Sequence, residues 1–137
     1  MKAIDTNVLV RYLVQDDPAQ GRKAAAYIES AAVANEQILI GNIVLCETVW
    51  VLDSAYGYEK REIEAVIARL LQTGTFQFEA KDIVSAAFEE YCVAKLDFAD
   101  CLIGRLNASL GCEPTATFDK ALRSLATFQI GNHISGF

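Results

Sequence analysis

Residues 1–18, MKAIDTNVLVRYLVQDDP, place a strand, a carboxylate and two helix starts in immediate succession. Residues 2–4 are expected to form a short strand that leads into Asp5, and Val8–Val14 a short helix. Asp17-Pro18 predicts the start of a second helix, because an acid at the N-cap followed by proline is typical of helix N-termini. This order of elements is typical of an α/β protein.

The rest of the chain continues the alternation of strands and helices. Short apolar or alternating runs predict further strands at Gln37–Ile40, Thr75–Phe78, Thr115–Phe118 and Ala126–Ile130. Longer periodic segments predict helices from Asp17 to about Ala32 and at Ile43–Tyr56, Glu59–Gln72, Lys81–Lys95 and Ala99–Leu110, with Gly57 and Gly111 as terminators. Such alternation indicates a mainly parallel central sheet flanked by helices, a three-layer α/β fold. The 137 residues suit a single domain, 1–137.

Composition limits the compartment and the class of protein. The chain is 53% hydrophobic and 22% charged, as in ordinary globular proteins, and it has no apolar run of the roughly 18–20 residues that span a membrane. Asp5, Asn7 and Arg11 interrupt the N-terminal apolar stretch, so it does not resemble a signal peptide. Four scattered cysteines without a CxxC pair are expected to be reduced thiols, which suits a cytoplasmic protein.

Two acids directly follow predicted strands. Asp5 ends the first strand and Asp119 ends the strand TATF, and the carboxyl ends of parallel strands are where open sheets bind ligands. Capping of the following helix explains Asp5 equally well.

Glu47 lies in the segment IVLCETVWVL, which is apolar nearly all round and is therefore expected to be buried on most sides. A carboxylate there needs a cation or a polar partner. The alternatives are a salt bridge to an arginine or a position at the edge of the apolar face.

Asp97 and Asp100 are three residues apart at a predicted helix start, so they share a flank of its first turn. Pure helix capping also explains the pair, because one acid serves as the cap and a second acid is common there. Gly104, one turn beyond Asp100, is expected to leave open space above it. The apolar stripe predicted to face the core consists of Ala99, Leu102, Ile103, Leu106 and Leu110.

Carboxylates from strand ends and helix starts can converge without any histidine or cysteine, and all-oxygen ligation suits Mg²⁺ or Mn²⁺. Such ions activate water and stabilise charge on a phosphodiester. Other chemistries lack their residues: the single histidine, His133, lies near the end of the chain, and GxSxG, P-loop and GxGxxG motifs are absent. The net charge of −6 argues against non-specific nucleic-acid binding, unless the acids are concentrated in a metal pocket with Lys and Arg lining its approaches.

Four motifs in order resemble the PIN-domain family, and within it the VapC-type toxin ribonucleases of toxin–antitoxin pairs. They are IDTN at 4–7, the glutamate at 47, DFAD at 97–100 and TFD at 117–119, with VLVRYLVQDDP and ETVWVL as further detail. The resemblance extends from Ala3 to about Leu125.

The resemblance implies a PIN fold, a homodimer, Mg²⁺ or Mn²⁺ as cofactor, and endoribonuclease activity that a small antitoxin protein neutralises. DNA would then be bound only indirectly, through the antitoxin. Asp5 and Asp100 match metal-ligating aspartates, Glu47 the third acid and Asp119 a more distant fourth. Supporting positions are matched by Thr6, Asn7, Asp97 and Thr117.

Two rival functions come from other classes. One is a PIN-like interaction module without turnover, which the complete set of acids argues against. The other is a dehalogenase-like phosphatase, which needs a second aspartate two residues after the nucleophile, where this chain has Asn7. Apolar residues on the early helices predict a homodimer with a groove for an antitoxin peptide; they are Val8, Leu9, Tyr12, Leu13, Val49, Trp50 and Leu52. The alternative is that all of these residues belong to the core of the chain itself.

Overall fold

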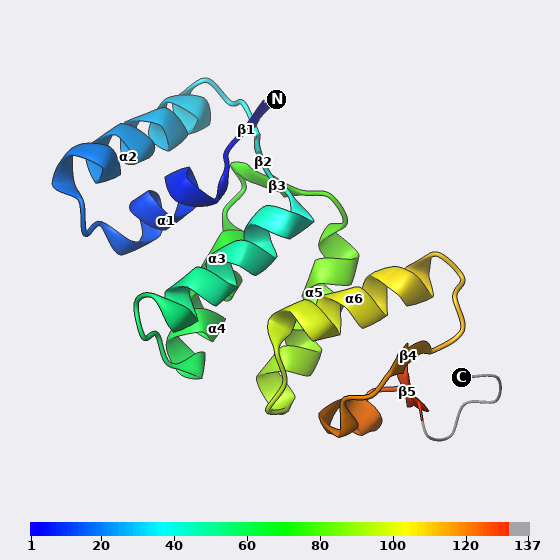
Figure 1. The fold of residues 1–137 in the computed structure, drawn as a ribbon. Coiled ribbons are helices and arrows are strands. Elements are labelled where there is room, and N and C mark those ends of the chain that lie inside the picture. Colours follow the sequence, from blue (N-terminus) through cyan, green and yellow to red (C-terminus); the bar gives the residue numbers. More distant parts are fainter. Residues whose placement is uncertain (132–137) are drawn as a thin grey trace. The chain divides into compact units, whose positions relative to one another are not determined.

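The computed structural model describes residues 1–131, which form two compact units drawn in Figure 1. Unit 1 comprises Met1–Lys81 and unit 2 begins at Asp82. Unit 1 contains β1 (Lys2–Ala3), α1 (Thr6–Val14), α2 (Pro18–Val33), β2 (Ile38–Ile40), α3 (Asn42–Ser54), α4 (Lys60–Gln72) and β3 (Phe76–Phe78). Unit 2 contains α5 (Lys81–Val93, which begins at the boundary), α6 (Phe98–Ser109), β4 (Thr115–Thr117), the 3₁₀ helix η1 (Lys120–Ser124) and β5 (Phe128–Ile130).

Every strand pairing described is parallel. In unit 1 the order is β1-β2-β3, with Lys2 opposite Ile38 and Ile38 opposite Phe76. In unit 2, β4 pairs with β5. The predicted α/β class with parallel strands is confirmed, and pairing divides the strands between two sheets.

The core of unit 1 lies between its sheet and its helices. Ile38 and Ile40 of β2 are completely buried, as are Leu9 of α1 and Leu52 of α3. In Figure 1 α1 and α2 run beside each other as an antiparallel pair, and α1 also contacts α3. Leu9 and Leu52 are therefore core residues, and the prediction that they belong to a docking face is wrong.

Local sequence signals account for the helix ends. Asp17 caps α2 by accepting a hydrogen bond from the backbone N–H of Gln20 at 3.0 Å, with Pro18 in the first turn, as predicted. Gly57 has a φ of +64° just after α3, a conformation that glycine adopts without strain. The first turn of α3 is capped by Glu79, which follows β3 and accepts from the N–H of Asn42 at 2.7 Å.

Two predictions about α6 are wrong. Of the predicted stripe, Leu102 is buried, but Ile103 is 46% and Leu110 is 82% exposed, and α6 instead buries Phe98, Cys101 and Gly104 beside Leu102. Gly104 does not open space above the helix, because the side chains of Thr127 and Phe128 lie where a Cβ would stand. The glycine instead lets the segment that leads into β5 approach the helix closely.

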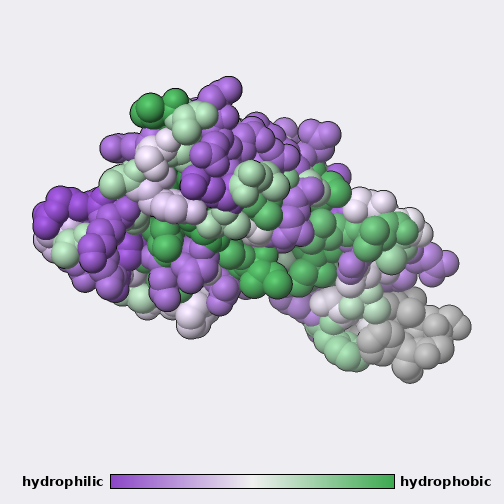
Figure 2. Space-filling view, turned by 90° about the horizontal axis from the view of Figure 1, so that it is seen from above, coloured by the Kyte–Doolittle hydropathy of each residue, from purple (hydrophilic) through white to green (hydrophobic). Residues whose placement is uncertain are grey.

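Large apolar side chains reach the surface at several positions. On the face that Figure 2 draws, hydrophobic residues lie exposed among hydrophilic ones. Trp50 and Ile43 of α3 are 69% and 75% exposed. None of the helices described within residues 1–131 is long and apolar enough to cross a membrane. No disulfide joins the four cysteines, all of which lie among the described residues, and His133 lies outside them.

Candidate active site

Asp5 lies two residues after the end of β1 and immediately before α1. Its Oδ1 accepts a hydrogen bond from the backbone N–H of Val8 at 3.0 Å, so Asp5 is the N-cap of α1. The side chain is nevertheless exposed. Both interpretations of Asp5 therefore agree with its geometry: it caps a helix, and it presents a carboxylate at the carboxyl end of a strand.

Glu47 is exposed, and the prediction that it is buried is wrong. Apolar residues occur on all sides of α3, but the helix buries only the face that carries Leu45, Thr48 and Leu52. The Thr6 hydroxyl donates a hydrogen bond to Glu47 Oε1 at 3.0 Å. Because Thr6 follows Asp5 in sequence, this bond ties the third acid of the predicted set to the segment that carries the first. No arginine forms a salt bridge with Glu47 in the described part of the chain.

In unit 2 the charges of two aspartates, Asp97 and Asp119, act on a third, Asp100. Asp97 is the N-cap residue of α6 and Asp100 lies in its first turn, while Asp119 follows β4 and caps η1 through the N–H of Ala121 at 2.9 Å. Burial, together with the negative charges of Asp97 and Asp119, raises the pKa of Asp100 above its ordinary value. Thr117 accepts a hydrogen bond from the backbone N–H of Asp119 at 3.0 Å, which fixes the start of this turn.

The acids thus form two sets, one in each unit. Unit 1 contributes Asp5 and Glu47, with the Thr6 hydroxyl between their segments, and unit 2 contributes Asp97, Asp100 and Asp119. Within either unit, the described residues include no group of three or more Asp, Glu, His or Cys side chains close enough to hold a metal ion. The donors are all oxygen, which is the ligand type that Mg²⁺ and Mn²⁺ prefer.

A network in unit 1 was not predicted. Arg11 donates to Asp16 at 3.0 Å, to Tyr56 at 3.3 Å and, through Nε, to Gln20 at 2.8 Å, and the Tyr56 hydroxyl donates to Asp16 at 2.9 Å. The Tyr56 hydrogen bond and the charge of Arg11 outweigh desolvation and lower the pKa of Asp16. Burial alone would lower the pKa of Arg11, but the charge of Asp16 and the bond with Tyr56 raise it. The signal in the sequence was Arg11 itself, a charge inside the apolar stretch VLVRYLV.

Comparison with known proteins assigns the family. A family model described as "PIN domain" matches residues 2–127, which takes in both units and both sets of acids. The chain belongs to the PIN-domain family. This PIN domain is also similar to a protein named "VapC ribonuclease" from Aquifex aeolicus (strain VF5), at 24% identity over 125 residues, 91% of this chain and 92% of the relative. No solved structure matches this PIN domain significantly.

Proposed function

We propose that this PIN domain is a divalent-metal-dependent endoribonuclease that hydrolyses RNA phosphodiester bonds. We further propose that it is the toxin of a VapBC-type pair, acts in the cytoplasm, and works as one domain. The observation that carries the proposal is the hydrogen bond from Thr6 to Glu47, which ties one carboxylate to the segment that carries the exposed Asp5 at the end of β1. In unit 2, burial and the negative charges of Asp97 and Asp119 raise the pKa of Asp100, and a cation bound near Asp100 would offset that cost.

We assign the acids as follows. Asp5 and Asp100 would ligate Mg²⁺ or Mn²⁺, and Asp97 and Asp119 would add negative charge near Asp100. When bound, the ion would supply an activated water and a counter-charge for the phosphodiester. Thr6 occupies one oxygen of Glu47, which leaves Oε2 able to accept a proton from the attacking water. Thr117 positions the turn that carries Asp119, and Asn7 offers an amide beside Asp5.

The name of the Aquifex relative supports the class of substrate, because that protein is a ribonuclease by name. The family match supports a PIN-type nuclease, since it extends over residues 2–127. A small antitoxin protein is the partner that the VapC type implies, with DNA bound only through that antitoxin. We also expect a homodimer, to which exposed apolar side chains such as Ile43 and Trp50 could contribute.

The test is cleavage of single-stranded RNA by the purified protein. Cleavage is expected with Mg²⁺ or Mn²⁺ and should stop on addition of EDTA. Asp53→Asn, which removes an exposed acid of α3 outside both sets, is the matched control and should cut like the parent. Undiminished cleavage in EDTA would contradict the mechanism. A protein that neither cuts RNA nor changes its Tm with Mn²⁺ would instead be an interaction module without turnover.

A further inference from the structure

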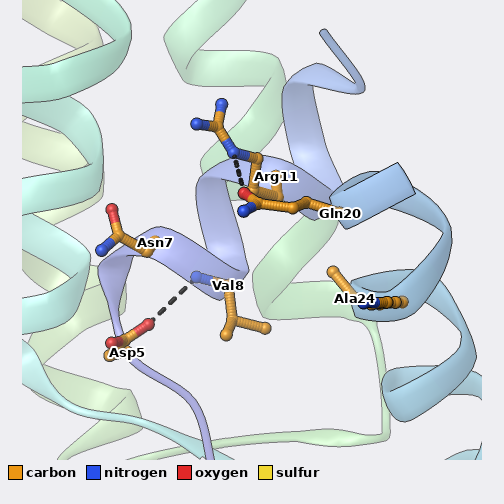
Figure 3. Close-up of a pocket in the computed structure, with 7 residues that line it drawn as sticks. Asp5, Asn7, Val8, Arg11, Gln20 and Ala24 are labelled. Atoms are coloured by element: carbon orange, nitrogen blue, oxygen red, sulfur yellow. Dashed lines mark hydrogen bonds between the residues drawn. The ribbon is translucent and has the colours of Figure 1, made fainter. Parts of the chain in front are cut away.

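A pocket of about 340 Å³ lies between α1 and α2, entirely within unit 1. Its size falls at the lower end of the range of about 300–1,000 Å³ for ligand pockets. Figure 3 draws the lining residues and labels all of them except Lys23, with Asp5 below Asn7 at one end and the Arg11–Gln20 pair at the other. The lining consists of Asp5, Asn7, Val8, Arg11, Gln20, Lys23 and Ala24.

One wall of the pocket is fixed before any ligand binds. The Nε of Arg11 donates to Gln20 Oε1, the dashed bond in Figure 3, and its Nη1 donates to Asp16 and Tyr56. Because Oε1 of Gln20 is occupied as an acceptor, its amide nitrogen remains to donate. This wall therefore offers N–H groups held in place by a network that joins α1, α2 and the segment after α3.

Lys23 supplies the positive charge of the pocket lining. Asp16 largely balances Arg11, whereas the ion pairs of the described residues do not include Lys23. Lys23 can only donate, as can the remaining nitrogens of Arg11 and Gln20, and Asn7 adds an amide. A ligand that matches this lining carries negative charge and several acceptor oxygens.

The position of Asp5 at the end of the pocket indicates which class of ligand the pocket binds. Asp5 is the proposed metal ligand, so a chain that passes from the metal into the pocket must place one anionic group at each. Successive phosphates of a nucleic-acid strand do this, and Val8 and Ala24 give the intervening sugar an apolar surface. We propose that this pocket binds the RNA phosphate next to the one that is cut, with Lys23 as its principal contact. The inference rests on the proposed ribonuclease function for its choice of ligand.

The experiment measures binding and cleavage separately. Binding of a fluorescein-labelled 20-nucleotide single-stranded RNA of randomised sequence is followed by anisotropy in EDTA, at several salt concentrations. Lys23→Ala is expected to weaken binding about three- to tenfold and to reduce the slope of log Kd against log salt by about 1, the loss of one phosphate contact. Lys23→Arg should restore both. Arg22→Ala, which removes the neighbouring exposed cation outside the pocket, is the control and should change the slope less.

Cleavage with Mg²⁺ distinguishes the two proposals. If the parent cuts RNA, Lys23→Ala should raise KM with kcat nearly unchanged, because the contact is made equally in the ground state and the transition state. Equal affinity and slope for Lys23→Ala and Arg22→Ala would overturn the pocket assignment, even in a protein that cuts RNA. Loss of binding to an acidic peptide but not to RNA would also overturn it, in favour of a protein ligand. If the parent protein binds RNA through Lys23 but does not cut it, the proposed ribonuclease function is contradicted, whereas the assignment of the pocket to RNA binding is supported.

Discussion

Asp5 is a residue in which a structural and a chemical use coincide. Its Oδ1 caps α1, and its exposed carboxylate lies at the end of β1 where a metal ligand is proposed. Asparagine caps a helix about as well as aspartate, whereas alanine does not. The two uses can therefore be separated by the choice of substitution.

Asp5→Asn is expected to keep the thermal stability of the metal-free protein and to abolish RNA cleavage. Asp5→Ala is expected to lose about 1 kcal/mol of stability, because the N–H of Val8 loses its cap, and to lose cleavage as well. Urea denaturation in EDTA and an RNA cleavage assay measure the two effects. An active Asp5→Asn variant would show that Asp5 is a cap and nothing more.

Asp100 predicts a dependence of stability on pH in the metal-free protein. Its pKa is raised above the ordinary 3.8, so the folded protein binds this proton more tightly than the unfolded chain does. Ionisation of Asp100 therefore costs stability as pH rises from 3.8 through the raised value. Asp100→Asn avoids that cost, so its advantage in Tm over the parent should be small below pH 3.8 and grow toward neutrality. A Tm difference that does not vary with pH would contradict the assigned effect of burial and of Asp97 and Asp119.

For single residues, the sequence predicts which acids to examine but not their surroundings. The carboxylates stand out because each follows a strand or opens a helix. The exposure of Glu47 could not be predicted, since α3 is apolar on all sides and its sequence does not say which face packs. The pocket residues were missed for a related reason: Lys23 is an ordinary surface lysine until α1 and α2 are placed side by side.

Among the elements, helix starts were predicted best because capping chemistry is local. Asp17-Pro18 identifies the start of α2 to the residue, and Gly57 and Gly111 take positive φ just beyond α3 and α6. The packing face of α6 was predicted wrongly because apolar residues occur on several of its sides, and periodicity then allows more than one stripe. Which face of α6 is buried depends on the segment at Thr127 and Phe128, which packs against Gly104 and is distant from it in sequence.

The close packing at Gly104 of α6 can be tested by substitution. A methyl group there would meet the side chains of Thr127 and Phe128, and such overpacking costs about 1–3 kcal/mol, against which alanine regains about 1 kcal/mol of helix propensity. Gly104→Ala is therefore expected to destabilise the protein by up to about 2 kcal/mol in urea denaturation. Gly74→Ala, at a site with nothing within 4 Å of the added Cβ, is the control and should lie within about 0.5 kcal/mol of the parent. A fully stable Gly104→Ala protein would argue against the close approach.

For the whole molecule, the net charge of −6 makes RNA an unfavourable ligand unless cations neutralise part of it. The structure locates some of the negative charge in the group around Asp100, and places Arg11 and Lys23 in the pocket beside Asp5. A metal ion would thus affect both catalysis and the approach of RNA.

Mn²⁺ is accordingly expected to raise the Tm of the parent, since an ion that binds only the folded state stabilises it by about 2.7 kcal/mol at 100 times its Kd. The rise should be smaller in Asp5→Asn and Asp100→Asn, and unchanged in Asp53→Asn. Differential scanning calorimetry with and without Mn²⁺ measures this effect. An equal rise in all four proteins would mean that the ion binds elsewhere.

Trp50, the single tryptophan of the chain, is 69% exposed and lies three residues after Glu47 on α3. An indole in contact with water emits at long wavelength in the native state, so unfolding should shift its spectrum little. Intrinsic fluorescence is therefore a poor monitor of denaturation for this protein. The same property makes the indole a sensitive optical reporter, because anything that covers the surface near Glu47 should displace water from it and shift its emission to the blue.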